Sequence, residues 1–206
     1  TLIKHLASIQ IETIAYPILK LISLNKNYRS LIVKAGNNDR RAQHELFELF
    51  SPKMLSVCRN YMKSTELAEE IMITGFFKVF INLHSFKSEG SFEGWIRRIM
   101  VNQCISQLRK DKKLVFNETE VIENTITHVS YQETTFDVDE IQKIIDALPN
   151  GYKTVFILHA IEGYKHSEIS ELLQISENTS KTQLFKARKL LQKQITKQLN
   201  TNYGTR

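Results

Sequence analysis

The sequence predicts an all-α protein made of two small helical domains joined by a flexible acidic linker. Apolar residues recur at three- and four-residue intervals through residues 27–113 and again through residues 139–206, as they do in helices that bury one face. Between these regions, residues 114–138 replace the periodic apolar positions with Asn, Thr, Ser and acidic residues, which is typical of a linker. No segment alternates apolar and polar residues convincingly enough to predict a sheet.

Composition and charge narrow the class of protein. The chain has 206 residues, of which 42% are hydrophobic, so it can bury two small cores. Its formal net charge of +6 favours a polyanionic partner, although many basic proteins bind no nucleic acid. The longest apolar stretch near the N-terminus, residues 14–24, contains Pro17 and Lys20 and is far shorter than a membrane span. Because no signal-cleavage pattern occurs, we expect a soluble, cytoplasmic protein. We assign no role to the N-terminal extension, residues 1–26.

Residues that carry catalytic or metal chemistry are sparse. Cys58 and Cys104 lie in apolar helical patterns and outside any Cys-x-x-Cys pair, so we expect reduced core residues rather than a disulfide or a zinc site. No His spacing suits a metal, and neither a phosphate-binding glycine loop nor a nucleophile motif occurs. His159 and His166 lie seven residues apart, and we expect core or surface roles for them. We therefore expect no catalytic residue, metal, cofactor or enzymatic activity.

In the first domain, the spacing predicts three helices. The first begins after a cap at Asn38 or Asp39, and Pro52 is expected to kink or split it. The second runs from about residue 65 to residue 83, with acidic residues in its first turns, where the helix dipole favours them. Residues 84–90 break the pattern and predict a loop. A third helix follows over about residues 91–110.

In the second domain, the pattern predicts four helices of different lengths. The first ends at Pro149, and the second starts with Asn150 as its cap and stops at Gly163. The other two are expected at about residues 167–173 and 177–198, separated by a tight turn. Two helices joined in this way, with the second one basic, predict a helix-turn-helix.

The last helix is the candidate for reading DNA. Six basic residues and one acidic residue lie between Ser176 and Gln198. The N-terminal half of such a helix can lie in a major groove, where amide, hydroxyl and cationic side chains reach bases or phosphates. The alternative is a solvated basic face on a terminal helix, and the pattern alone leaves both interpretations open.

Residues 84–110 combine aromatic, basic and polar side chains. Single-stranded DNA binds to surfaces that offer rings for stacking and cations for phosphates, and a loop that captures an extruded base would hold separated strands apart. The alternative is that the aromatic residues simply form core. We favour core for Phe92 and Trp95, whereas both interpretations stay open for the preceding loop.

These segments together resemble the extracytoplasmic-function sigma factors, the minimal two-domain class of the sigma-70 family of RNA polymerase subunits. The first domain of that family has two acidic residues followed by x-x-Gln-Glu-x-Phe-x-x-x-Phe, where this chain has Glu69-Glu-Ile-Met-Ile-Thr-Gly-Phe-Phe-Lys-Val-Phe80. It then has Gly-Ser-Phe-x-x-Trp-Leu-x-x-Ile-x-x-Asn, matched by Gly90-Ser-Phe-Glu-Gly-Trp-Ile-Arg-Arg-Ile-Met-Val-Asn102.

The second domain resembles the same family. Its motifs are Leu-Pro, Glu-Gly, Glu-Ile-Ala, Ser-x-x-Thr-Val-Lys and Arg-Ala-Arg. This chain has, in the same order, Leu148-Pro149, Glu162-Gly163, Glu168-Ile-Ser170, Ser176-Glu-Asn-Thr-Ser-Lys181 and Lys186-Ala-Arg188. The resemblance covers about residues 27–113 and 139–198.

The resemblance implies a subunit that binds core RNA polymerase, recognises promoter DNA in duplex and melted form, and helps to open it. An anti-sigma factor, which commonly holds members of this family inactive, is a further partner that the resemblance suggests. The polymerase-binding residues would be Glu66, Glu69, Glu70, Phe77 and Phe80. The upstream melted element would contact His84, Phe86, Lys87, Ser88, Arg98, Asn102, Gln103, Arg109 and Lys110. The distal duplex element would contact Ser176, Asn178, Thr179, Lys181, Thr182, Gln183, Lys186 and Arg188.

Several positions depart from the family pattern. Ile73 and Thr74 replace the usual Gln-Glu, which weakens the acidic surface that would face the polymerase. Ser106 stands where Asp is common, and Ser180 replaces a usually buried Val. Gln183 replaces a common Arg. Such changes are compatible with altered promoter preference, weaker polymerase binding or reduced activity.

The main competing hypothesis is a helix-turn-helix regulator that acts without joining polymerase. Its DNA-binding domain would have the same pattern. It leaves the Gly90–Asn102 segment and the acidic linker unexplained, and the sigma-factor interpretation accounts for both.

Overall fold

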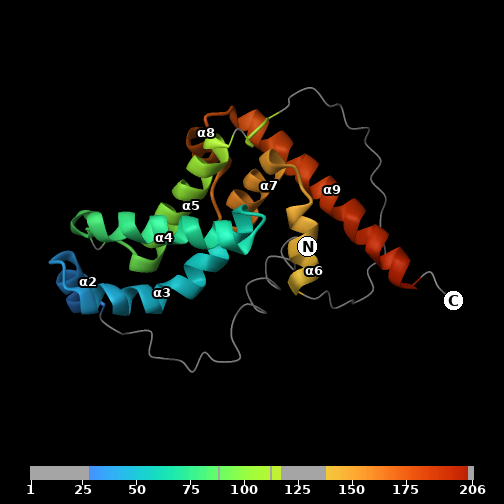
Figure 1. Cartoon of the computed structure of the whole chain (residues 1–206). Helices are drawn as coiled ribbons and strands as arrows, with labels where there is room; N and C mark the ends of the chain where they lie inside the picture. Colours follow the sequence, from blue (N-terminus) through green and yellow to red (C-terminus); the bar gives the residue numbers. More distant parts are fainter. Residues whose placement is uncertain (1–27, 88, 112, 117–137, 204–206) are drawn as a thin grey trace. The chain divides into compact units, whose positions relative to one another are not determined.

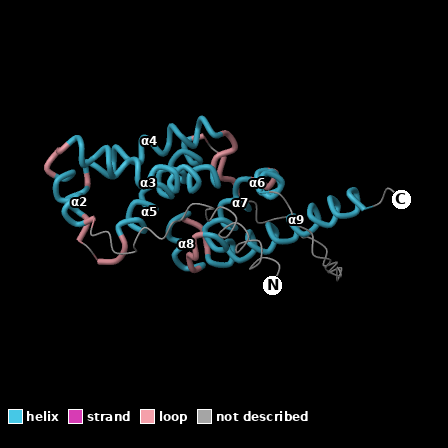
Figure 2. The backbone as a smooth tube through the Cα atoms, turned by 90° about the horizontal axis from the view of Figure 1, so that it is seen from below, coloured by secondary structure: helices cyan, strands magenta, loops and turns pink. Residues whose placement is uncertain are grey.

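The computed structural model describes residues 28–87, 89–111, 113–116 and 138–203. Within these ranges the chain forms helices and turns without a strand (Figure 2), so the all-α prediction is confirmed. The described residues fall into two compact units, which divide after Asp111. Our interpretations of residues 1–26 and of most of the linker concern positions outside the described residues.

The first unit consists of helices that enclose one apolar core. Figure 1 shows the arrangement of these helices. Helices α3, α4 and α5 pack against one another, and α2 packs against α3. The core includes Leu46, Met54, Ile71, Phe76 and Met100. The elements are α2 (Arg29–Gly36), α3 (Arg40–Tyr61), α4 (Thr65–Ile81), the 3₁₀ turn η1 (Leu83–Ser85) and α5 (Phe92–Lys110).

Short polar side chains begin the three long helices of this unit. Asp39 accepts hydrogen bonds from two backbone N–H groups in the first turn of α3, at 2.9 and 3.1 Å. Ser64 and Ser91 each accept one in the same way, for α4 and α5. Such a cap contributes about 1 kcal/mol. Of the two candidates for α3, Asp39 is the one whose side chain caps the helix.

Pro52 does not split α3, because the helix continues through it from Arg40 to Tyr61. A proline removes one backbone hydrogen bond from a helix and crowds the preceding turn. Here α3 buries side chains on both sides of the proline, among them Phe50 and Met54. Packing against the core therefore offsets the local cost.

Helices α4 and α5 approach closely at Gly75. A Cβ atom at this position would lie 2.3 Å from the sulfur of Met100, and Met100 is fully buried. No side chain could be added at Gly75 without moving a packed neighbour. Cys58 and Cys104, also in this core, are buried thiols, as expected.

The second unit contains the helix-turn-helix. Helix α9 packs against α6, α7 and α8. Gln174 takes a left-handed conformation (φ 57°) after α8, and the hydroxyl of Ser176 caps α9 by accepting from the N–H of Thr179 at 3.0 Å. The elements are α6 (Val138–Asp146), α7 (Asn150–Phe156), the π-helical turn η2 (Ile157–Ile161), α8 (His166–Leu173) and α9 (Glu177–Tyr203).

Two local features of this unit differ from the sequence analysis. Helix α7 begins at Asn150 itself, and its N-cap position is Pro149, so the expected cap by the Asn150 side chain is wrong. The π-helical turn after α7 was not expected. It ends the helix before Gly163, whose φ of 76° suits glycine.

Candidate polymerase and nucleic-acid interfaces

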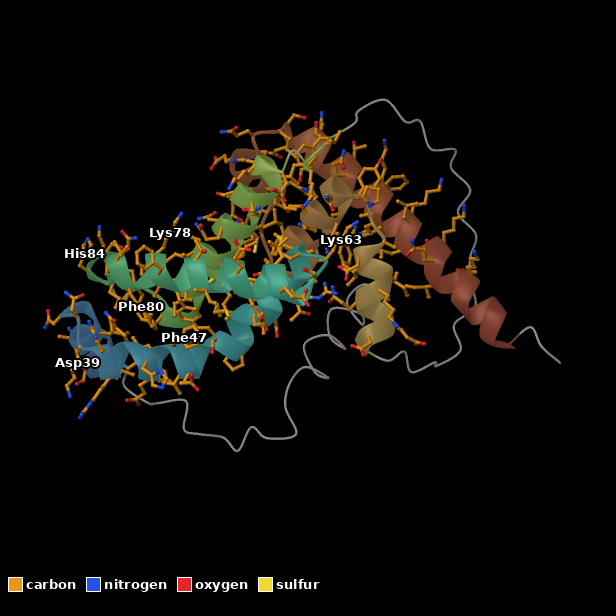
Figure 3. The ribbon with its side chains drawn as sticks, viewed as in Figure 1. Asp39, Phe47, Lys63, Lys78, Phe80 and His84 are labelled. Carbon is orange, nitrogen blue, oxygen red and sulfur yellow. The ribbon has the colours of Figure 1, made fainter. Side chains whose placement is uncertain are left out.

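Helix α4 carries the residues predicted to contact polymerase. Glu66, Glu69 and Glu70 are all exposed, as is Phe77. Phe80 is half-buried, and its ring lies 6.0 Å from that of Phe76 in the core. In Figure 3, Phe80 lies between α3 and α4, near Phe47. The structure therefore presents four of the five residues on the surface, and Phe80 mainly supports the helix.

The same helix exposes an apolar strip, of which the sequence analysis predicted only Phe77 as a contact residue. Ile73, Phe77 and Ile81 are 59%, 66% and 55% exposed. Their four-residue spacing places them along one face of α4. We call these three residues the apolar strip. The sequence feature that could have predicted this strip is that α4 has apolar residues on two faces, because only one of these faces can pack against α3 and α5.

The loop before α5 meets an aromatic cluster. The ring of Phe86 lies 5.1 Å from that of Phe92 and 5.5 Å from that of Trp95. Phe92 is buried, as expected of a core residue, whereas Phe86 and Trp95 are half-buried. His84 and Lys87 are exposed. In Figure 3, His84 lies just beyond the C-terminal end of α4. The predicted site residue Ser88 lies outside the described residues.

Helix α5 continues from this cluster with a polar face. Trp95, Arg98, Asn102 and Arg109 follow one another at spacings that keep them on one side of the helix. Arg98, Asn102, Arg109 and Lys110 are exposed and Gln103 is half-buried. The predicted residues thus form a track that leads from half-buried rings to cationic side chains, an arrangement that suits a single strand.

The residues predicted on α9 and its turn divide between two faces. Ser176, Asn178, Lys181, Thr182 and Arg188 are exposed. The remaining three, Thr179, Gln183 and Lys186, are buried. The exposed set faces solvent and is available to a DNA backbone or base edge.

The buried set is unusual in its polar groups. Gln183 is fully buried and neither its amide nitrogen nor its amide oxygen has a hydrogen-bond partner. The Lys186 ammonium also has none, and lies 5.9 Å from the centre of the Tyr152 ring. Such groups cost about 1–3 kcal/mol each when buried without a partner. Gln183 and Lys186 are therefore not surface residues in this structure.

Phe185 is a candidate DNA-contacting residue that the sequence analysis missed. Its ring is 51% exposed, and it lies on α9 three positions after Thr182 and three before Arg188. An aromatic ring amid basic and polar residues can contact the methyl group of thymine in a major groove. The available signal was a large apolar residue on the polar side of the predicted helix.

The described residues contain neither a metal-binding cluster nor a membrane span. No group of three or more His, Cys, Asp or Glu side chains is arranged to hold a metal ion. No helix in the same ranges has the length and apolar character needed to cross a membrane.

Comparisons with known proteins agree with this geometry. Family models for sigma-70 region 2 and sigma-70 region 4 match residues 46–114 and 139–191. RNA polymerase sigma factor SigV of Bacillus subtilis is 30% identical over 139 residues, which cover 68% of this chain and 82% of that protein. The chain belongs to the sigma-70 family of RNA polymerase sigma factors, in its extracytoplasmic-function group.

Two further matches describe the likeness to other sigma factors. The ECF RNA polymerase sigma factor SigW of Bacillus subtilis is 28% identical over 176 residues, or 79% of this chain and 92% of that protein. A solved structure of the sigma factor RpoE with the anti-sigma factor NepR from Bartonella quintana superposes with a TM-score of 0.51 at 19% identity. It covers 74% of this chain and 96% of that one, and it supports the fold.

Proposed function

We propose that this sigma factor binds core RNA polymerase, directs it to promoters and helps to open the DNA there. The observation that carries the proposal is the presence of both sigma-70 regions, region 2 at residues 46–114 and region 4 at residues 139–191, in one chain. A regulator that acts without polymerase would account for the helix-turn-helix alone. Because polymerase works in the bacterial cytoplasm, we propose that location as well.

Polymerase would bind to α4. The apolar strip, Ile73, Phe77 and Ile81, supplies surface that becomes buried on docking. The exposed carboxylates Glu66, Glu69 and Glu70 supply charge complementarity to a basic partner surface. In this chain, apolar contact would replace part of the polar contact that Gln-Glu makes at residues 73–74 elsewhere in the family.

Melted DNA would bind to the η1–α5 segment, and duplex DNA to α9. In the first, half-buried Phe86 and Trp95 provide stacking surfaces beside Arg98 and Asn102. In the second, the exposed residues Asn178, Lys181, Thr182 and Arg188 would contact bases and phosphates. An anti-sigma factor, like the one in the RpoE complex, is a further partner that we propose from the family.

The first experiment is co-elution on a sizing column with core polymerase from the same organism, stripped of its own sigma subunits. Co-elution, followed by transcription from a promoter that core polymerase alone leaves silent, would support the proposal. A chain that binds duplex DNA but elutes apart from polymerase would instead identify a stand-alone regulator.

A further inference from the structure

A pair of stacked histidine rings lies where the helix-turn-helix begins in the second unit. His159 belongs to η2 and His166 is the first residue of α8. Their ring centres are 4.5 Å apart and their planes are inclined by 15°. We call these two residues the histidine pair. Both side chains are half-buried.

Each ring is anchored by its Nδ1 atom. Nδ1 of His159 lies 2.9 Å from the carbonyl oxygen of Tyr164. Because a carbonyl oxygen only accepts, Nδ1 of His159 must carry a proton and donate it. Nδ1 of His166 lies 2.8 Å from the hydroxyl of Ser180 in α9. The pair therefore connects the turn after α7, the start of α8 and the first half of α9.

Ser180 makes this connection specific to this chain. It is fully buried and stands where the family usually has Val. A buried hydroxyl needs a hydrogen-bond partner, and His166 provides it. The bond links the N-terminal half of α9, which carries exposed Lys181 and Thr182, to the first residue of α8. The π-helical turn that carries His159 is a rare conformation, of a kind found often at functional sites.

The charges around His166 disfavour its protonation. Its pKa is lowered from the ordinary value of 6.5, first by burial, then by His159 in η2 and Lys181 in α9, with a smaller effect of Arg188. Glu177 in α9 acts in the opposite direction. On the side of α8, the Glu168 carboxylate accepts a hydrogen bond from the backbone N–H of Lys165.

A lowered His pKa sets the direction of the pH effect. The folded state binds a proton at His166 less readily than the unfolded state does. Neutral His166 therefore stabilises the folded state. This stabilisation is complete above the ordinary pKa value of 6.5, and it is lost as the pH falls below that value. A proton on His166 also adds positive charge beside His159 and near Lys181 and Arg188, and it turns Nδ1 into a donor, so that the Ser180 hydroxyl can no longer donate to this atom.

We propose that His166, supported by His159, is a positioning residue that holds α9 in place for DNA reading, and that protonation of His166 weakens this hold. DNA binding by the second unit then decreases on acidification. A decrease in DNA binding on acidification distinguishes this role from direct DNA contact, because a histidine that merely faced DNA would bind phosphate more tightly once charged. The DNA part of the inference rests on the proposed function, whereas the link between His166 and α9 does not.

The first test is an NMR pH titration of the full chain from about pH 8 to pH 5, following the His166 ring and the Ser180 backbone amide. The proposal expects the His166 ring to titrate below the ordinary His value and the Ser180 amide to shift with the same midpoint. A Ser180 amide that does not respond while His166 titrates would overturn the proposal.

The second test compares thermal unfolding at about pH 7.5 and pH 5.5. The variant His166→Phe with Ser180→Val removes the titrating ring and the buried hydroxyl together, so no polar group is left without a partner. It should lose less stability on acidification than the native chain. His44→Gln, at an exposed position in the other unit, is the matched control and should keep the native pH response. Equal pH responses in the native chain and the double variant would contradict the proposal.

The third test measures binding of a fluorescein-labelled 40-base-pair random duplex at low salt. The native chain should lose affinity at the lower pH, and the double variant should lose less. Tighter binding by the native chain at the lower pH would overturn the DNA part of the proposal. Absence of binding at both pH values would count against the proposed function, and the NMR and unfolding tests would still decide the link to α9.

Discussion

Helices α4 and α9 both carry proposed binding residues, but they depart from ordinary burial in opposite directions. Helix α4 exposes the apolar strip, Ile73, Phe77 and Ile81, whereas α9 buries the polar side chains of Gln183 and Lys186. An exposed apolar face loses no hydrogen bond to water when a protein partner covers it. A buried polar group without a partner costs free energy until it is satisfied or replaced.

The comparison separates two kinds of interface in one small protein. On α4, the proposed binding energy comes from apolar surface, and charge acts mainly on specificity. On α9, it comes from the exposed cationic and polar residues, while the opposite face holds the helix in its domain. Substitutions on one helix should therefore change different properties from substitutions on the other.

The largest expected effect is on polymerase binding. Phe77→Asp places a carboxylate in the middle of the apolar strip, and should weaken binding to core polymerase by about 2 kcal/mol or more, as hot-spot residues do. Thermal stability should change little, because Phe77 is 66% exposed. Titration of labelled protein with core polymerase measures the loss.

Val33→Asp is the matched control for this variant, since Val33 is a similarly exposed apolar residue on α2. It should leave polymerase binding unchanged. Equal losses in both variants would mean that α4 is not the specific contact.

The next effect concerns the packed face of the same helix. Gly75→Val introduces a branched side chain where even a Cβ atom would lie 2.3 Å from the sulfur of Met100. Overpacking of this kind should destabilise the first unit by about 1–3 kcal/mol. Urea unfolding measures the change, and Gly75→Val with Met100→Ala should recover part of it. No change in stability would show that the Met100 side chain or the two helices can move aside at little cost.

A gain in stability is expected on α9. Lys186→Met keeps a long, unbranched side chain against Tyr152 and removes a buried ammonium that has no hydrogen-bond partner. It should stabilise the second unit by about 1–2 kcal/mol. Lys193→Met, at an exposed position of α9, is the control and should have little effect. A loss of stability in Lys186→Met would show that the ammonium is favourable where it lies.

The smallest effect is expected from a single exposed cation. Lys181→Ala should weaken duplex binding by about 1 kcal/mol and reduce by about one the slope of log affinity against log salt. Polymerase co-elution should be unaffected, because Lys181 lies in the other unit. Binding of duplex DNA by Lys181→Ala with the native salt dependence would remove Lys181 from the proposed interface.

Local sequence signals predicted much of the fold because their causes are local. Asp39 and Ser176 cap α3 and α9 where short acceptor side chains precede a helical pattern, and Gly163 takes the positive φ expected of a helix stop. Asn150 was misjudged as a cap, since Pro149 already occupies that position and Asn150 is the first helical residue. The π-helical turn after α7 has no signal of this kind.

By itself, the sequence determined the helical class, the helix-turn-helix and the family, because periodicity, caps and motif spacing are properties of neighbouring residues. Only the tertiary structure decided which helix faces are covered. Periodicity assigns Ile73 and Phe77 to one side of α4, but their exposure depends on where α3 and α5 pack. Likewise, Gln183 and Lys186 have the composition of a DNA-binding face, and the packing of α9 buries them. The stack of His159 on His166 arises because a π-helical turn and a tight bend bring together two rings seven residues apart.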